Sequence, residues 1–166
     1  MDPVEQRPRR SQKSKAGPGL RARALGMLAR RELSRLELAR KLAQYSEDRD
    51  EILALLDEFE QRGWLSDRRV MEQVTAYRRG RFGMRRIIHE LRDKGIAEEV
   101  INAAMSALKD TEFDAARSVW RKKFGKPPQS ATERARQLRF LQGRGFTMET
   151  ALKITAENEF DESHAQ

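Results

Sequence analysis

Clusters of arginine and lysine in the middle and C-terminal thirds of the chain are the residues best suited to chemistry. The segment "RRGRFGMRRIIHELRDK", residues 78–94, is rich in guanidinium groups and has only Glu90 and Asp93 as local acids. A second cluster, "WRKKFGK", follows at residues 120–126. Guanidinium groups present planar, forked donors that suit phosphates and carboxylates. The pattern therefore predicts a surface that binds an anionic partner.

Helical spacing places part of the first cluster along one stripe. Arg85, His89 and Arg92 are spaced i, i+4 and i+7, while Ile87 and Leu91 point the other way. We predict a contact stripe formed by Arg79, Arg81, Arg85, Arg86, Arg92 and Lys94. The auxiliary contacts are Arg121, Lys122, Lys123 and Arg144. A solvated face of intrahelical ion pairs is the alternative for the same residues.

The sequence offers little for catalysis or metal binding. It has no cysteine and two histidines, His89 and His164, whereas zinc sites need several converging ligands. The acids of "EDRDEILALLDEFE", residues 47–60, could be magnesium ligands of a nuclease. They flank the apolar positions Ile52 and Leu56, however, as a solvated helix face does. We therefore expect no enzyme activity, no cofactor, no metal and no small-molecule substrate.

Composition indicates the class of partner. Charged residues make up 36% of the 166, against roughly 25% in typical proteins, and the net charge is +8. Residues 22–67 sum to −2, residues 68–108 to +4 and residues 109–157 to +5, so a polyanion or an acidic protein surface suits the last two parts. No apolar run approaches the roughly 20 residues that cross a bilayer. We expect a cytoplasmic protein with no membrane contact.

Apolar residues at spacings of three and four predict helices throughout residues 22–157, in nine pieces. The predicted helix starts are Ser34-x-x-Glu37, Thr111-x-x-Asp114 and Ser130-x-x-Glu133, which resemble capping boxes, and the N-caps Ser66 and Thr147. The predicted helix ends are Gly63, Gly95 and Gly145. Residues 1–21 have little apolar content and predict a disordered basic arm, while residues 158–166 predict a flexible acidic tail.

The helical region repeats itself. At a shift of 49 residues, Leu25, Leu28, Leu33, Leu38, Leu42, Ile52, Leu56 and Phe59 fall on Val74, Tyr77, Phe82, Ile87, Leu91, Ile101, Met105 and Leu108. A looser third copy follows if about eight residues near "KPPQSATE" are inserted. We predict an all-α chain of three tandem three-helix units, residues 22–67, 68–108 and 109–157, stacked into an elongated, curved monomer. The aromatic residues, Tyr77 among them, are expected in the cores rather than at base-stacking positions.

These segments resemble a known family. The stretch "RRGRFGMRRIIHELRDKGI" at residues 78–96, "RELSRLELARKL" at 31–42 and "RGWLSD" at 62–67 are similar to the RecX family of regulators of the RecA recombinase. The resemblance covers about residues 20 to 157, and the middle segment is its most specific part. The basic N-terminal arm and the insertion at Pro127-Pro128 depart from the family pattern.

The resemblance implies a non-catalytic regulator. Such a protein would bind the RecA–single-stranded DNA filament in its groove and inhibit its ATPase, strand-exchange and coprotease activities, modulating recombination, DNA repair and the SOS response. Weak binding to single- or double-stranded DNA is also expected. The alternative is a helix-turn-helix protein that binds duplex DNA, because three-helix units can present a recognition helix. A metal-dependent nuclease is the third class, and DNA cleavage that needs magnesium would identify it.

Overall fold

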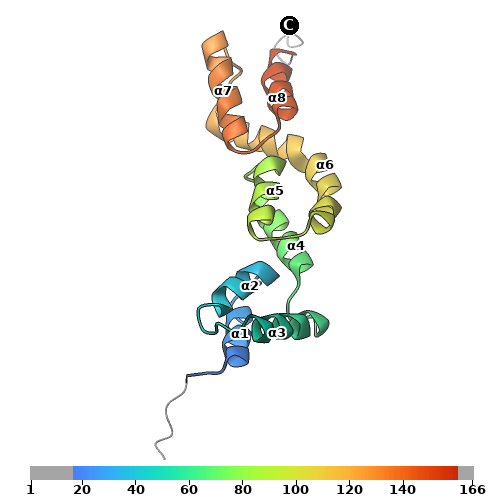
Figure 1. Ribbon diagram of the computed structural model, residues 1–166. Helices are drawn as coiled ribbons and strands as arrows, with labels where there is room; N and C mark the ends of the chain where they lie inside the picture. Colours follow the sequence, from blue (N-terminus) through green and yellow to red (C-terminus); the bar gives the residue numbers. More distant parts are fainter. Residues whose placement is uncertain (1–16, 161–166) are drawn as a thin grey trace, which may run out of the picture.

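The chain forms an elongated stack of helices. The computed structural model describes residues 17–160, with side chains described through residue 156, and this part of the chain contains eight helices and no strand. The helices are α1 (Leu20–Leu28), α2 (Arg35–Leu42), α3 (Arg49–Gln61), α4 (Asp67–Arg78), α5 (Met84–Asp93), α6 (Glu98–Lys123), α7 (Ala131–Gly143) and α8 (Met148–Phe160). Figure 1 shows α1–α3 at one end of a long column and α7 and α8 at the other. The all-α prediction is confirmed.

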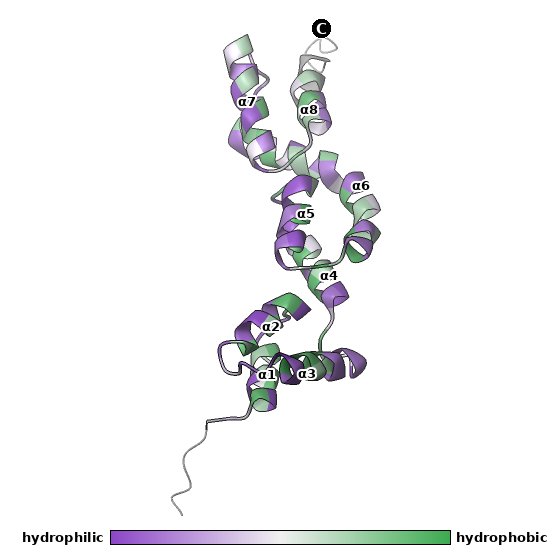
Figure 2. Cartoon of the chain, in the orientation of Figure 1, coloured by the Kyte–Doolittle hydropathy of each residue, from purple (hydrophilic) through white to green (hydrophobic). Residues whose placement is uncertain are grey.

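Each predicted unit has its own apolar core. The first core is built from α1–α3 around Leu38, Leu42 and Phe59, and the second around Ile87 and Leu91. The third contains Ala116, Trp120, Leu141, Phe146, Ala151 and Ile154. Hydrophobic and hydrophilic residues alternate around most helices, and α5 is mostly hydrophilic outside its core stripe (Figure 2). Within residues 17–160, none of the helices has the length and apolar character that crossing a bilayer would require.

Most predicted helix ends are confirmed. Ser34 forms a full capping box: its hydroxyl accepts from the Glu37 amide at 3.1 Å, and the Glu37 carboxylate accepts from the Ser34 amide at 2.9 Å. The hydroxyls of Ser66, Ser130 and Thr147 also accept amide hydrogen bonds at helix starts. Gly63, Gly95 and Gly145 adopt positive φ angles of 70°, 73° and 87°. Helix starts and ends were thus readable from the side chains that satisfy free backbone groups.

One predicted start is wrong, which reduces the nine predicted pieces to eight helices in the described residues. Thr111 lies inside α6, where its hydroxyl donates to the Ala107 carbonyl at 2.9 Å instead of capping a new helix. Residues 98–123 contain neither glycine nor proline, so nothing interrupts the backbone hydrogen bonds. The resulting 26-residue α6 packs on α4 and α5 at one end and on α7 and α8 at the other. It is therefore shared by the second and third units.

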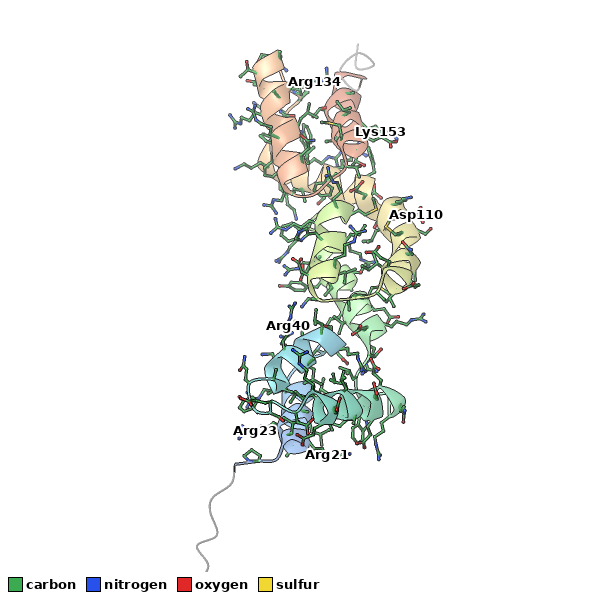
Figure 3. All side chains as sticks on the ribbon, in the orientation of Figure 1. Arg21, Arg23, Arg40, Asp110, Arg134 and Lys153 are labelled. Carbon is green, nitrogen blue, oxygen red and sulfur yellow. The ribbon has the colours of Figure 1, made fainter. Side chains whose placement is uncertain are left out.

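The predicted termini also need correction. Leu20 and Arg21, assigned to a disordered arm over residues 1–21, belong to α1. Arg21 forms an ion pair with Glu58 and lies over the Phe59 ring, which fixes the first turn of α1 on the core (Figure 3). Residues 158–160, assigned to the acidic tail, belong to α8. The rest of both predicted segments, residues 1–16 and 161–166, lies outside the described residues.

Two repeat-matched positions predicted for the core face solvent. Leu25 is 37% exposed, because Ala24 takes the inward position of α1. Tyr77 is 63% exposed, whereas the neighbouring Arg78 in the last turn of α4 is half-buried. The Arg78 guanidinium lies over the Phe82 ring and binds Glu90 with an Nε–Oε2 distance of 2.9 Å. An apolar match between repeats does not fix which neighbouring residue turns inward.

The units are joined by a contact that occurs twice. At the first joint the Ser34 hydroxyl, which caps α2, donates to the Lys94 carbonyl at 2.6 Å. At the second joint the amide of Gly83, which caps α5, donates to the Arg144 carbonyl at 3.0 Å. In both cases the accepting residue directly precedes a glycine with positive φ in the next unit. Each joint thus uses equivalent positions of successive units.

Replacing Gly145 by alanine is expected to weaken the second joint by about 3 kcal/mol of unfolding free energy, which combines the cost of a left-handed alanine with that of overpacking. A Cβ at Gly145 would lie 2.4 Å from Cβ of Arg86 and 2.7 Å from its backbone nitrogen. Gly143→Ala is the matched control, because a Cβ there meets nothing within 4 Å and the helical φ suits alanine. Urea unfolding measures both variants. Equal stabilities for the two would contradict this account of the joint.

Candidate partner-binding surface

α5 separates its apolar and cationic residues on two faces. Ile87, Ile88 and Leu91 are buried against α4 and α6, with exposed fractions of 1%, 8% and 0%. Arg85 and Arg86 are exposed on the other face, beside the turn between α7 and α8. Gly83 caps the helix and brings its first turn so close to that turn that a Cβ would lie 2.2 Å from the Phe146 amide nitrogen. The close approach brings cations of two units together.

An open hollow of about 390 Å³ lies where the second and third units meet. Its cationic lining consists of Arg81 from the turn after α4, Lys122 and Lys123 from the end of α6, and Arg144 from the end of α7. The rest of the lining is Gly80, Val119 and Phe140. Within the described part of the chain, none of these four cations forms an ion pair with an acid. Their charge is available to a partner.

The Phe82 ring connects this hollow to α5. The guanidinium carbons of Arg86 and Arg144 lie 4.1 Å and 5.6 Å from the ring centroid, and that of Arg78 lies 5.6 Å away. Such cation–π contacts orient guanidinium groups without neutralising them. We call the surface formed by Arg81, Arg86, Lys122, Lys123 and Arg144 the junction surface.

Comparison with known proteins identifies the family. The model of the second three-helix domain of RecX matches residues 66–105, and that of the third matches residues 110–154. "Regulatory protein RecX" of Leptothrix cholodnii is 46% identical over 144 residues, which cover 86% of this chain and 92% of that protein. The protein of the same name from Neisseria gonorrhoeae is 37% identical over 147 residues, or 87% of this chain and 95% of its own length. This chain belongs to the RecX family.

A crystal structure agrees with the RecX fold seen here. RecX from Lactobacillus salivarius superposes with a TM-score of 0.74 over 85% of this chain and 95% of its own, at 16% sequence identity. At that identity the likeness shows the fold alone. The overall fold of this chain has therefore already been observed in a RecX protein.

Two of the ten predicted contact residues of this RecX chain already form ion pairs with acids of the same chain. The Lys94 ammonium binds the Glu37 carboxylate across the first joint at 2.9 Å, with only 21% of the lysine side chain exposed. Arg92 Nε lies 2.6 Å from Glu98 Oε1, although that pair is largely exposed. The predicted stripe therefore loses charge toward its C-terminal end, and Lys94 serves the joint.

Three other predicted residues, Arg79, Arg85 and Arg121, do not line the hollow at the second joint. Arg85 lines a neighbouring hollow with Arg86, His89 and Gln142. Arg79 caps the end of α4 and is exposed. Arg121 lines a further hollow along α6 with Asp114 and Arg117, and Lys122 borders both this hollow and the one at the second joint. The structure thus gathers Arg81, Lys122, Lys123 and Arg144 around one hollow and links Arg86 to it through Phe82, whereas Arg79, Arg85 and Arg121 do not line it.

The residues considered for catalysis form ion pairs or cap a helix. The side chain of His89 is 77% exposed and its Nδ1 lies 3.1 Å from Asp93 Oδ2. Among the acids of residues 47–60, Asp48 caps α3, while Asp57 and Glu60 bind Arg35. No group of three or more histidine or acidic side chains in the described residues could hold a metal ion.

Sequence reasoning missed Glu112, which holds the second joint together. This buried carboxylate accepts from the Met84 and Thr147 amides at 3.1 and 3.2 Å, and from the hydroxyls of Thr147 and Thr150, both at 2.8 Å. Its position could have revealed it, because Leu108, Glu112 and Ala116 follow at spacings of four on the buried face of one helix. The predicted capping box at Thr111 concealed that pattern.

The Glu37 carboxylate at the first joint should make the free energy of unfolding depend on pH. Burial acts to raise the pKa of Glu37, but hydrogen bonds from the Ser34 amide and from Lys94 outweigh it, so the pKa lies below the ordinary 4.5. The unfolded chain binds that proton more readily, so the stabilisation is complete above pH 4.5 and is lost as pH falls through the lowered pKa. Glu37→Gln should therefore unfold with less dependence on pH below 4.5 than the unaltered protein, in urea titrations. Identical pH profiles would contradict this.

Proposed function

We propose that this RecX-family protein is a non-catalytic regulator that acts in the cytoplasm on the RecA–single-stranded DNA filament. It would lie in the helical groove of the filament and inhibit ATP hydrolysis, strand exchange and coprotease activity. Family membership supports a regulatory role, and the names of its relatives support RecX as the class of regulator. The proposal assigns the contact with the filament to the junction surface.

The observation that carries this proposal is the junction surface itself. Four cations from two units line one open hollow without an acid partner in the described residues, and a fifth, Arg86, is linked to it through the Phe82 ring. A filament offers repeated phosphates and carboxylates along its groove. An elongated body can span neighbouring protomers, so that several weak contacts act as linked binding events. A small substrate in an enclosed pocket would not use this geometry.

The placement of the cations favours a filament over the helix-turn-helix alternative. A recognition helix reads the major groove with side chains along one exposed helix face. On the outer face of α5, His89 and Arg92 are engaged with Asp93 and Glu98. The junction surface instead collects cations from turns and helix ends of two units. That arrangement is better suited to contacting a nucleic-acid backbone or a protein surface than to reading base edges in the major groove.

Capture experiments test the proposal. The protein is mixed with RecA filaments on immobilised single-stranded DNA, with free RecA, with bare single-stranded DNA and with duplex DNA, at low and physiological salt. We expect strongest retention on the filament, together with slower ATP hydrolysis. Tight, sequence-selective duplex binding that survives physiological salt would instead establish the helix-turn-helix function.

A further inference from the structure

We propose that the junction surface binds single-stranded nucleic acid directly, with a base stacked on Tyr77 and the neighbouring phosphates held by the cations of the hollow. This inference deepens the proposed function and rests on it for the source of the strand, which is the DNA inside the filament. It names the component of the filament that this surface meets. It also assigns a role to an aromatic side chain that lies outside the three apolar cores.

Tyr77 is exposed enough for such a contact. It is 63% exposed, more than any other large hydrophobic side chain in the described part of the chain, and it belongs to none of the three cores. Burying an aromatic ring is favourable, so a ring left on a charged surface marks a place where a partner can cover it. A purine or pyrimidine provides a flat face of matching size.

Two guanidinium groups lie over the ring and leave most of the side chain exposed. The guanidinium carbons of Arg78 and Arg81 lie 5.3 Å and 5.7 Å from its centroid, and 63% of the side chain remains accessible. Arg81 also lines the hollow with Lys122, Lys123 and Arg144, so the ring and the phosphate-binding cations are connected through one residue. Aromatic rings beside a cationic groove are the usual means of holding a single strand.

Tyr45 provides the contrast. It is also exposed, at 51%, but the Arg23 guanidinium carbon lies only 4.4 Å from its ring centroid, closer than either arginine lies to Tyr77. It lies in the first predicted unit, whose net charge is −2. The chain therefore contains one tyrosine in close contact with a single cation on an acidic unit, and one more exposed tyrosine with looser cation contacts on a basic surface. Only the second is suited to a nucleic acid.

The chemistry favours a single strand over the other anionic partners. Bases in a duplex are stacked on both sides, so a surface ring can gain a stacking contact only from a strand whose bases are accessible. Carboxylates of a protein would satisfy the cations but would leave the ring of Tyr77 in water. A single strand satisfies both the ring and the cations of the junction surface.

The test compares oligonucleotides with and without bases, in the absence of RecA. Fluorescence anisotropy measures binding of the full-length protein to a labelled 20-nucleotide oligothymidylate and to an abasic strand of equal length and charge. We expect the unaltered protein to prefer the base-bearing strand by about fivefold or more, the effect of one stacked base. Tyr77→Ala should remove that preference, and Tyr77→Phe should retain it. Tyr45→Ala is the matched control and should change nothing.

Distinct outcomes separate this inference from the proposed function. The inference is overturned if Tyr77→Ala keeps the preference for bases, or if it weakens filament capture while leaving oligonucleotide binding unchanged, which would indicate a protein contact. Inhibition of filament ATP hydrolysis by the unaltered protein is measured in parallel. Base-dependent binding without inhibition would refute the proposed function alone. Inhibition without base-dependent binding would refute the stacking contact alone.

Discussion

Replacing Arg81 and Lys122 together by alanine is expected to raise the concentration needed to inhibit filament ATP hydrolysis by about tenfold or more. Each side chain is exposed and lines the hollow without an acid partner among the described residues. A charge-assisted contact contributes about 1.5 to 3 kcal/mol when desolvated and less at an exposed site, and 1.4 kcal/mol is a factor of ten. Two such losses make tenfold a conservative expectation.

A matched double variant controls for the change in net charge. Arg30 and Arg40 are exposed on the first unit and form no ion pair in the described part of the chain, and Arg40 projects from α2 in Figure 3. Their replacement by alanine also removes two positive charges. Inhibition should stay within about twofold of the unaltered protein, because these residues lie far from the junction surface. Equal losses from the two double variants would show that net charge, rather than this surface, governs inhibition.

Varying the ionic strength provides a second comparison of the same two double variants. Contacts between exposed charges are screened over about 8 Å at physiological salt. The difference between the junction variant and its control should therefore be largest at low salt and shrink as salt is added. A difference that does not change with salt would indicate altered folding instead, which the helical signal of each variant monitors.

Glu112→Ala is expected to lower the free energy of unfolding by about 4 kcal/mol. The buried carboxylate satisfies two backbone amides and two hydroxyls from α5 and α8, and each buried donor left without an acceptor costs about 1 to 3 kcal/mol. Relaxation and water entry at the joint recover part of that sum. Urea unfolding measures the change.

Two further variants show whether the buried carboxylate is responsible. Glu112→Gln retains the shape and one oxygen acceptor, so about half of the loss should remain. Asp114→Ala, two residues along the same helix, removes an exposed acid and should change stability by no more than about 0.5 kcal/mol. If Glu112→Ala were as stable as Asp114→Ala, the second joint would not depend on this carboxylate.

Local signals made much of this fold predictable. Ser34 and Glu37 predict the start of α2 because each side chain accepts a hydrogen bond from an amide that the helix leaves free. Ile87, Ile88 and Leu91 define the buried face of α5, and Gly95 ends the turn that follows. These features involve residues close together in sequence, so a single sequence contains the information that fixes them.

The predictions were wrong where contacts between residues far apart in the sequence determine the structure. Thr111 and Asp114 resemble a helix start, but packing on α4, α5 and α8 holds the helix continuous through them. The engagement of Lys94 with Glu37 joins residues 57 positions apart and could not be read from spacing. For the same reason the sequence predicted a stripe along α5, whereas the structure gathers cations around a joint between two units.

Crosslinking from the junction surface tests the central claim most directly. The chain has no cysteine, so Lys122→Cys introduces a single thiol that can carry a photoactivated crosslinker. Arg40→Cys places the same probe on the first unit. Irradiation with assembled filaments should attach the Lys122 probe to the DNA strand or to RecA at least about tenfold more efficiently than the Arg40 probe, as one site-specific contact would. Equal yields from both positions would contradict a contact through the junction surface.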